Sequence, residues 1–155
     1  ARGRMKGLVQ RVFRACVRVE GEVVGEIGPG LCVFVGVGHD DGEDDAALLA
    51  ERVANLRVFQ DEAGKMNLSL LDTSRALLAV SQFTLMGDTR RGRRPSFVAA
   101  AEPSRAAALI EGFVEIARGL GLDVATGRFG ADMKIEIGAD GPVTLMLDTS
   151  EKRKG

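Results

Sequence analysis

The side chains that could do chemistry are few in this sequence, and the richest group follows an apolar run. Ser81-Gln82-Phe83-Thr84-Leu85 sets two hydroxyls, an amide and an aromatic ring in consecutive positions. A strand is predicted over 76–85, in which Gln82 and Thr84 would share one face while Ser81 and Phe83 share the other. These residues could line a small polar pocket, although they are also ordinary at a strand end.

Four arginines stand shortly after this group, in Arg90-Arg91-Gly92-Arg93-Arg94. Guanidinium groups bind phosphate oxygens through paired N–H donors, so the run suits a phosphate backbone. A solvated basic loop is the alternative, and both interpretations stay open. The formal net charge of the whole chain is −1, so affinity for nucleic acid must come from this local patch.

The sequence offers few side chains suited to acid–base catalysis or to metal binding. His39 is the only histidine, so a Ser-His-Asp triad could be built only on it. Its place beside an acidic helix start favours a simple turn residue. Cys16 and Cys32 lie in apolar surroundings without zinc-ligand spacing, which predicts reduced core thiols and no metal. No phosphate-binding glycine motif is present, so we expect no cofactor.

A backbone feature occurs near the end of the chain, at Gly141-Pro142. The cis form of a bond before proline costs only about 0.5–1 kcal/mol. A cis bond there would turn two carbonyl oxygens in a direction that ordinary strand geometry does not allow. A plain turn proline is the alternative.

The helices and strands expected around these residues indicate an α+β fold. The pattern gives a strand over 8–19 with a hairpin at 20–22, and a buried strand over 31–37. Helices are predicted after the acidic stretch 40–45 and from Glu102-Pro103 onward, where Pro103 takes the favoured first position. We expect a curved, barrel-like β-sheet with two main helices packed on it.

The C-terminal part predicts two short strands, at 134–137 and 143–147, joined by a hairpin at 138–141. The length of 155 residues predicts one domain, which we place at 5–148. Residues 1–4 precede Met5 and are interpreted as an N-terminal extension or a cloning scar. Residues 149–155 predict a basic flexible tail. No apolar stretch reaches about 18 residues, so we expect no membrane span and a cytoplasmic location.

Together these features resemble one family, the D-aminoacyl-tRNA deacylases of bacteria and eukaryotes, first described on D-tyrosyl-tRNA. The resemblance covers nearly the whole chain, and its motifs follow one another in the family's order. They are Gln10-Arg11-Val12, Gly64-Lys65-Met66-Asn67, Ser81-Gln82-Phe83-Thr84-Leu85, Arg94-Pro95-Ser96-Phe97, Gly127-Arg128-Phe129-Gly130-Ala131-Asp132-Met133 and Gly141-Pro142-Val143-Thr144. Each is weak alone, but their order and spacing are specific. Cys16, where serine is frequent, departs from the pattern outside any motif.

The resemblance implies a homodimer that hydrolyses the ester joining a D-amino acid or glycine to tRNA, with active sites at the interface. The 81–85 motif would hold the 3′-terminal adenosine and the aminoacyl group, and Phe129, Met133 and Arg11 would also bind substrate. The Gly141-Pro142 bond, in cis, would reach into the partner's site and exclude an L side chain with its carbonyl oxygens. Arg11 would help to hold that loop.

The family is thought to use the 2′-hydroxyl of the tRNA to activate water, so Thr84 would position substrate rather than attack it. The expected partners are charged tRNA and a second copy of the chain, without DNA or membrane. Two other functions stay open. One is a covalent Thr84 esterase acting on small esters, and the other is a module that binds RNA 3′ ends without catalysis.

Overall fold

The computed structural model describes residues 4–151. Their elements, in chain order, are β1 (Lys6–Val19), β2 (Glu22–Ile27), β3 (Gly30–Gly36), α1 (Glu43–Asn55), β4 (Phe59–Gln60), β5 (Met66–Leu68), α2 (Leu70–Thr73), β6 (Ala76–Ser81), a 3₁₀ turn (Phe83–Met86), α3 (Pro103–Gly119), β7 (Val124–Thr126) and β8 (Lys134–Asp148). The predicted 20–22 hairpin and both main helices are confirmed, and α2 adds one further turn of helix.

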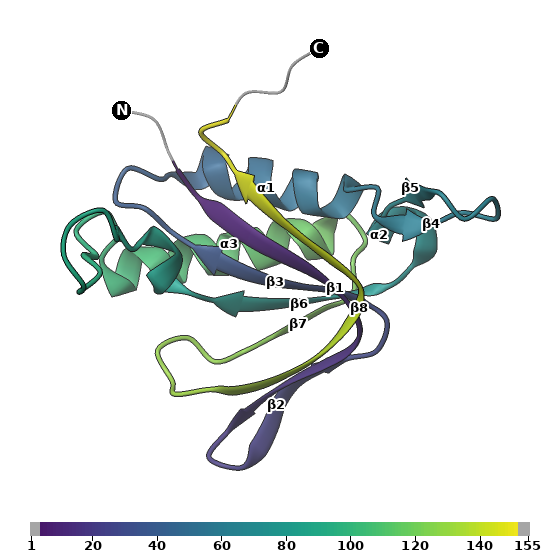
Figure 1. The fold of residues 1–155 in the computed structure, drawn as a ribbon, viewed down its shortest axis with the longest axis horizontal. Coiled ribbons are helices and arrows are strands. Elements are labelled where there is room, and N and C mark those ends of the chain that lie inside the picture. The colour runs from purple at the N-terminus through teal and green to yellow at the C-terminus, as the bar shows by residue number, and fades with distance from the viewer. Residues whose placement is uncertain (1–3, 152–155) are drawn as a thin grey trace.

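Six strands form one strongly bent sheet around the long strand β1 (Figure 1). β1 pairs antiparallel with β3 and β2 along one edge and with β8 along the other, whereas β3, β6 and β7 run parallel. β2 returns toward β7 at Gly25, where a Cβ would stand 2.2 Å from the carbonyl oxygen of Thr126. Only glycine permits this approach, which nearly closes the predicted barrel-like sheet.

One apolar core packs against each of the two faces of this sheet. α1 and α3 cover the outer face, where Leu49 and Phe113 pack with Leu31 and Val33 of β3. Within the bend, Cys32 of β3 packs instead with residues of β1, β2 and β6. β3 is therefore buried on both faces, as its continuous apolar run predicted.

The prediction of two C-terminal strands joined by a hairpin is wrong. The single strand β8 runs through both of them and pairs with β1 over its whole length, from Lys134 to Asp148. Opposite one residue of β1, Arg11, β8 carries the four residues 140–143, so the ladder is interrupted there by a bulge. Because β1 offers 14 residues of continuous partner, both halves of β8 can pair on the same neighbour.

The predicted terminal segments are only partly within the described residues. Residues 1–3 and 152–155 lie outside them. Thr149 donates its backbone N–H to the carbonyl of Met5 at 2.9 Å, and Arg52 donates to the carbonyl of Glu151 at 3.0 Å. The first residues of the predicted tail thus lie against the domain. None of the helices in residues 4–151 has the length and apolar character needed to cross a membrane.

Candidate active site

Three parallel strands end at the same edge of the sheet, and the Ser81–Leu85 motif begins there. β3 leads to Val37, β6 ends at Ser81, and β7 leads into the 127–133 segment. The crossover helices α1 and α3 begin near this edge. In sheets with parallel strands, the carboxyl ends of the strands are the usual place for a ligand, because the chain diverges there and leaves a crevice.

The crevice is a cavity of about 550 Å³, which we call the main cavity. Five of the predicted site residues line it, namely Ser81, Gln82, Phe83, Phe129 and Met133. Phe83 and Phe97 meet edge to face, with ring centroids 5.1 Å apart. The wall is thus largely apolar and aromatic, with a hydroxyl and an amide at one side, which suits a planar base joined to a polar sugar.

Sequence reasoning missed the other wall of the main cavity. It is formed by the segment before α3 and by the first turns of that helix, through Phe97, Ala100, Ala101, Pro103, Ala106 and Ile110. Phe97 stands in one of the resembling motifs, so a signal for it existed. Ile110 is a partly buried residue packed against the apolar core, and small alanines carry no chemical signal at all.

The predicted strand 76–85 stops at Ser81, and the chain then turns. The Gln82 N–H makes the last bond to the sheet, at the Val35 carbonyl, 2.8 Å away. A 3₁₀ turn follows over Phe83–Met86, so the strand alternation predicted for Gln82 and Thr84 does not hold. The Gln82 amide nevertheless donates to the Thr84 hydroxyl, which is exposed beside the cavity rather than part of its lining.

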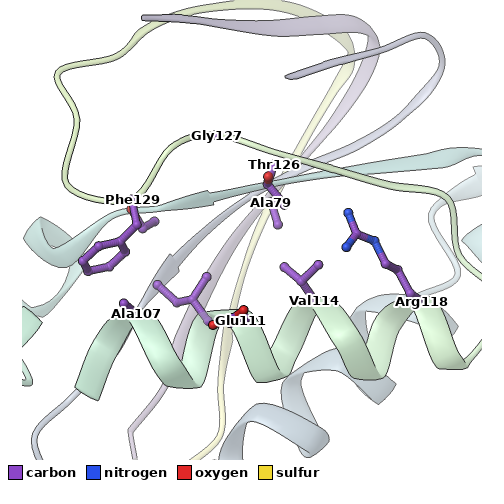
Figure 2. A pocket seen from close by; sticks show the side chains of 10 residues that line it. Ala79, Ala107, Glu111, Val114, Arg118, Thr126, Gly127 and Phe129 are labelled. Atoms are coloured by element: carbon purple, nitrogen blue, oxygen red, sulfur yellow. The ribbon is translucent and has the colours of Figure 1, made fainter. Parts of the chain in front are cut away.

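A smaller cavity of about 320 Å³ lies between α3 and the sheet and shares Ser81, Ile110 and Phe129 with the main cavity (Figure 2). Glu111 and Arg118 of α3 line it from below, and Arg118 donates to the carbonyl of Val124 at 3.0 Å. Phe129 therefore lines both cavities, the main cavity with its aromatic wall and the smaller cavity that is also lined by the charged residues Glu111 and Arg118.

The Gly141–Pro142 peptide bond is cis. Arg11 links the bulge that contains this bond to another part of the chain. Its Nε donates to the Asp140 carbonyl in the bulge at 3.1 Å, and its Nη1 donates to the Val58 carbonyl at 2.7 Å. Gly141 has a φ of +120°, and a Cβ there would stand 2.8 Å from Arg11 Nη2. In residues 4–151, neither Arg11 nor Gly141–Pro142 contributes to the lining of either cavity.

Strand registers separate the Gly141–Pro142 bulge from the Ser81 motif. Arg11, opposite the bulge, pairs with Leu31 of β3, whereas Ser81 pairs with Val35. Four residues along a strand correspond to about 13 Å. The two features also lie on β8 and β6, which are three strands apart in the sheet. Within this chain, the bulge and the main cavity therefore lie at opposite ends of the sheet.

The four predicted arginines lie in a loop over residues 88–96, which we call the arginine loop. Asp88 and Ser96 close it by exchanging backbone hydrogen bonds at 2.7 and 2.9 Å. Arg90 is engaged within the loop, since Nε and Nη2 donate to the Asp88 carboxylate at 3.0 and 2.8 Å. These bonds lower the pKa of Asp88 to about 2. Arg91, Arg93 and Arg94 are exposed.

His39 belongs to a turn, as its surroundings predicted. Its backbone N–H and its Nδ1 both lie within hydrogen-bond distance of the Ala99 carbonyl, at 2.9 and 3.1 Å, and its Nε2 lies 3.4 Å from Asp40. It is not among the residues that line the main cavity or bind Thr84 in the described part of the chain. Residues 4–151 also contain no cluster of side chains suited to a metal ion.

Comparison with known proteins finds relatives along nearly the whole chain. The family model described as D-Tyr-tRNA(Tyr) deacylase matches residues 8–148. A D-aminoacyl-tRNA deacylase of Dehalococcoides mccartyi is 57% identical over 148 residues, covering 96% of this chain and 97% of the relative. A D-aminoacyl-tRNA deacylase of Bacillus velezensis is 53% identical over 147 residues, covering 95% of this chain and 100% of the relative.

Two solved structures share the fold. One, described as a c-Myc DNA unwinding element binding protein, has a TM-score of 0.87 and 38% identity, covering 96% of this chain and 99% of its own. Another, described as a probable eukaryotic D-amino acid tRNA deacylase, has a TM-score of 0.83 over 94% of this chain and 99% of its own, and at 17% identity it supports the fold alone. From the family model and the bacterial relatives, this chain belongs to the D-Tyr-tRNA(Tyr) deacylase family.

Proposed function

We propose that this protein hydrolyses the ester bond between a D-amino acid, or glycine, and the 3′ end of tRNA, in the cytoplasm where charged tRNA is used. The observation that carries the proposal is the main cavity. Its aromatic wall suits the terminal adenine, and Ser81 and Gln82 offer polar groups for the ribose and the aminoacyl group. The curated relatives carry the name of this activity.

The proposed active unit is a homodimer. In one protomer, the Gly141–Pro142 bulge lies at the opposite end of the sheet from Ser81, so it can act on the main cavity only from a second copy. The exposed strand β8 and its neighbour β1 also present large apolar side chains to solvent. Phe13 is 56% exposed, Leu145 41% and Met146 48%, which suits a surface covered by a partner.

Chiral selection is proposed to work by exclusion. A site that accepts glycine cannot depend on gripping a side chain, because glycine has none. The carbonyl oxygens of Gly141 and Pro142 would occupy the space that an L side chain needs, while a D side chain points away. Rotamer changes cannot move backbone oxygens aside, and the fork of Arg11 fixes the preceding carbonyl of Asp140.

The proposed chemistry relies on the substrate for activation of water. Among residues 4–151, the hydrogen bond found for the Thr84 hydroxyl comes from the Gln82 amide, which donates and cannot take up a proton. A covalent Thr84 mechanism would need a neighbouring base. The 2′-hydroxyl of the terminal ribose is therefore proposed to assist the attacking water, with Thr84 positioning the ester.

One assay tests the function and the selection together. The same tRNA is charged with a D-amino acid, its L enantiomer or glycine, and release of the labelled amino acid is followed. We expect hydrolysis of the D and glycyl esters and sparing of the L ester. Equal rates on D and L esters would refute the exclusion, and tight binding without hydrolysis would favour an RNA 3′-end binding module.

Thr84→Ala tests the role of the hydroxyl. Loss of an essential nucleophile costs many orders of magnitude, whereas loss of a positioning group leaves substantial single-turnover activity, which is the expected result. Collapse to the background rate, with folding and tRNA binding intact, would instead support the covalent esterase. In a companion measurement, a terminal 2′-deoxyadenosine charged on its 3′-hydroxyl should be hydrolysed much more slowly; an undiminished rate would contradict assistance by the 2′-hydroxyl.

A further inference from the structure

The wall of the main cavity before α3 has little support of its own. The segment 97–102 connects the arginine loop to α3 and forms no regular element. It contributes Phe97, Ala100 and Ala101 to the cavity lining. The position of this wall must therefore come from whatever the segment is bonded to.

The segment is bonded to the turn that follows β3. His39 donates its backbone N–H to the Ala99 carbonyl at 2.9 Å, and Ala101 donates to the Val37 carbonyl at 3.0 Å. Gly38 and Ala100 form an isolated antiparallel bridge between these two bonds. The wall thus takes its place from the shape of the turn 37–42.

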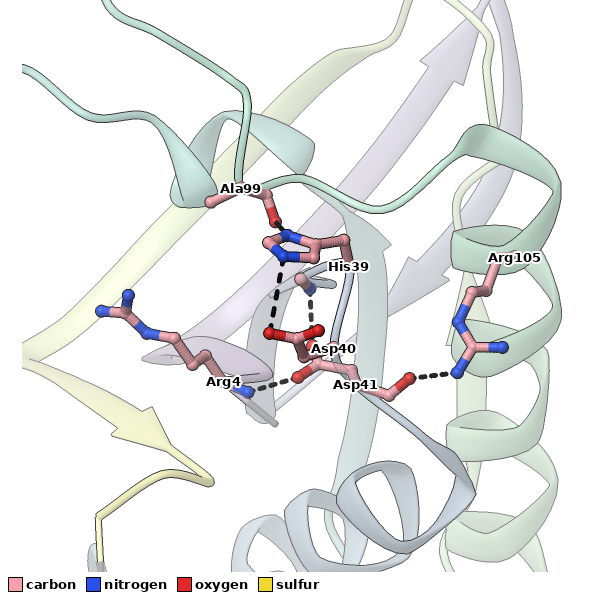
Figure 3. Close-up of polar contacts among 7 residues, drawn as sticks. Arg4, His39, Asp40, Asp41, Ala99 and Arg105 are labelled. Atoms are coloured by element: carbon pink, nitrogen blue, oxygen red, sulfur yellow. Dashed lines mark hydrogen bonds and ion pairs between the residues drawn. The ribbon is translucent and has the colours of Figure 1, made fainter. Parts of the chain in front are cut away.

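A fully buried carboxylate sets the shape of that turn (Figure 3). Asp41 has 0% exposure, and its Oδ2 accepts the backbone N–H of Gly38 at 2.5 Å. Its Oδ1 accepts the backbone N–H of Arg4, before β1, and its carbonyl accepts a hydrogen bond from Arg105 of α3. Asp41 therefore joins the turn to the start of β1 and to the helix that continues the wall.

Burial raises the pKa of the Asp41 carboxyl, while the N–H groups of Gly38 and Arg4 act in the opposite direction. A buried carboxylate is unfavourable unless hydrogen bonds compensate it. Asp41 is nevertheless not part of the cavity lining, to which Ser81 and Gln82 belong. The hydrogen bonds of the Asp41 carboxylate therefore act on the backbone around it and not on a group in the cavity.

We propose that Asp41 is a positioning residue for the substrate cavity, which holds the wall segment 97–102 in the place where it contacts the bound nucleoside. This inference rests on the proposed function, since it assigns the terminal nucleoside to the main cavity. The carboxylate is needed because each of its two oxygens accepts one backbone N–H. Asparagine has a single acceptor oxygen, so Asp41→Asn leaves one of these N–H groups facing an amide donor.

The test compares Asp41→Asn with Asp45→Asn, a matched control in the first turn of α1. Asp45 also accepts a backbone N–H, from Gly42 at 2.9 Å, but in the part of the chain that the structure describes no hydrogen bond joins its side chain to Gly38, Arg4 or the wall. For D-aminoacyl-tRNA hydrolysis, Asp41→Asn should raise KM by about tenfold with little change in kcat, because the wall binds ground state and transition state alike. Asp45→Asn should leave both constants unchanged.

A second readout does not depend on activity. Amide hydrogen exchange of His39 and Ala101 reports the two bonds that join the wall to the turn, and it should be faster in Asp41→Asn than in wild type or Asp45→Asn. If Asp41→Asn fails to fold, Arg105→Met, which removes the partly buried hydrogen bond to the Asp41 carbonyl, should show smaller changes of both kinds.

The outcomes separate the two proposals. If wild-type protein does not hydrolyse D-aminoacyl-tRNA, the proposed function fails, and exchange still decides whether Asp41 holds the wall. If Asp41→Asn has the KM of wild type, or exchanges His39 and Ala101 no faster, the positioning role is refuted. An equal rise in KM for Asp41→Asn and Asp45→Asn would also refute it, since general loosening of the helix start would explain both.

Discussion

Arg11 and the arginines of the 88–96 loop carry the same guanidinium group, yet the two regions expose it to opposite extents. The Arg11 side chain is 9% exposed and donates to the carbonyls of Asp140 and Val58. The Arg90 side chain is 87% exposed, and Arg91, Arg93 and Arg94 also lie in solvent. At the first site the chain itself supplies the acceptors, whereas in the arginine loop, among the described residues, Asp88 supplies them to Arg90 and the side chains of Arg91, Arg93 and Arg94 face solvent.

The difference shows why residue type alone does not assign a role. A planar fork of five donors suits backbone carbonyls as well as phosphate oxygens. Arg11 was predicted to bind substrate and to hold the Gly141–Pro142 loop, and its contacts support the second role. In the arginine loop, Arg90 is already engaged by Asp88, so phosphate contacts are expected mainly from the three other arginines.

The largest expected effect is on folding, from Arg11→Ala. The change leaves the buried carbonyl of Val58 and the partly buried carbonyl of Asp140 without their donor, which should lower the free energy of unfolding by about 3 kcal/mol. Denaturant unfolding measures it. As a control, Arg14→Ala removes an exposed arginine 3.7 Å from Glu136, and should cost less than about 1 kcal/mol. Equal losses for both variants would contradict the comparison.

The next effect is on RNA binding, from joint replacement of Arg91, Arg93 and Arg94 by alanine. Each lost phosphate contact should flatten the logarithmic salt dependence of tRNA affinity by about one unit of slope. The unfolding free energy should stay within about 0.5 kcal/mol of wild type, because these side chains are exposed. An unchanged affinity and slope would show that the loop is only a solvated surface.

The smallest effect separates Arg90 from its neighbours. In Arg90→Ala the pKa of Asp88 should rise from about 2 toward its ordinary value of 3.8, as followed by NMR titration of the carboxyl carbon. Because the folded-state pKa is lowered, the Asp88–Arg90 contact supports the loop above the ordinary pKa and is lost as pH falls through about 2. The change in salt slope should be smaller than for Arg91→Ala; a larger one would assign Arg90 to phosphate directly.

The elements with a strong local pattern were predicted well. The apolar run ending in Val37, the acidic start of α1 and Pro103 at the start of α3 specify their elements through side-chain period and helix-end chemistry. Errors occurred where a neighbour decided the outcome. The strand predicted over 76–85 ends at Ser81, because the next carbonyl of the parallel ladder, that of Val37, accepts the N–H of Ala101 instead.

The sequence by itself determined the family, the two main helices, the strands β1 and β3 and five of the residues that line the main cavity, since each depends on short-range spacing or on the order of motifs. Only the tertiary structure decided that β8 runs unbroken past Gly141–Pro142, that Arg11 lies beneath the bulge, and that Asp41 joins the turn 37–42 to β1 and α3. These depend on pairing between residues at least 37 positions apart, and no local pattern states which distant carbonyl or N–H will complete them.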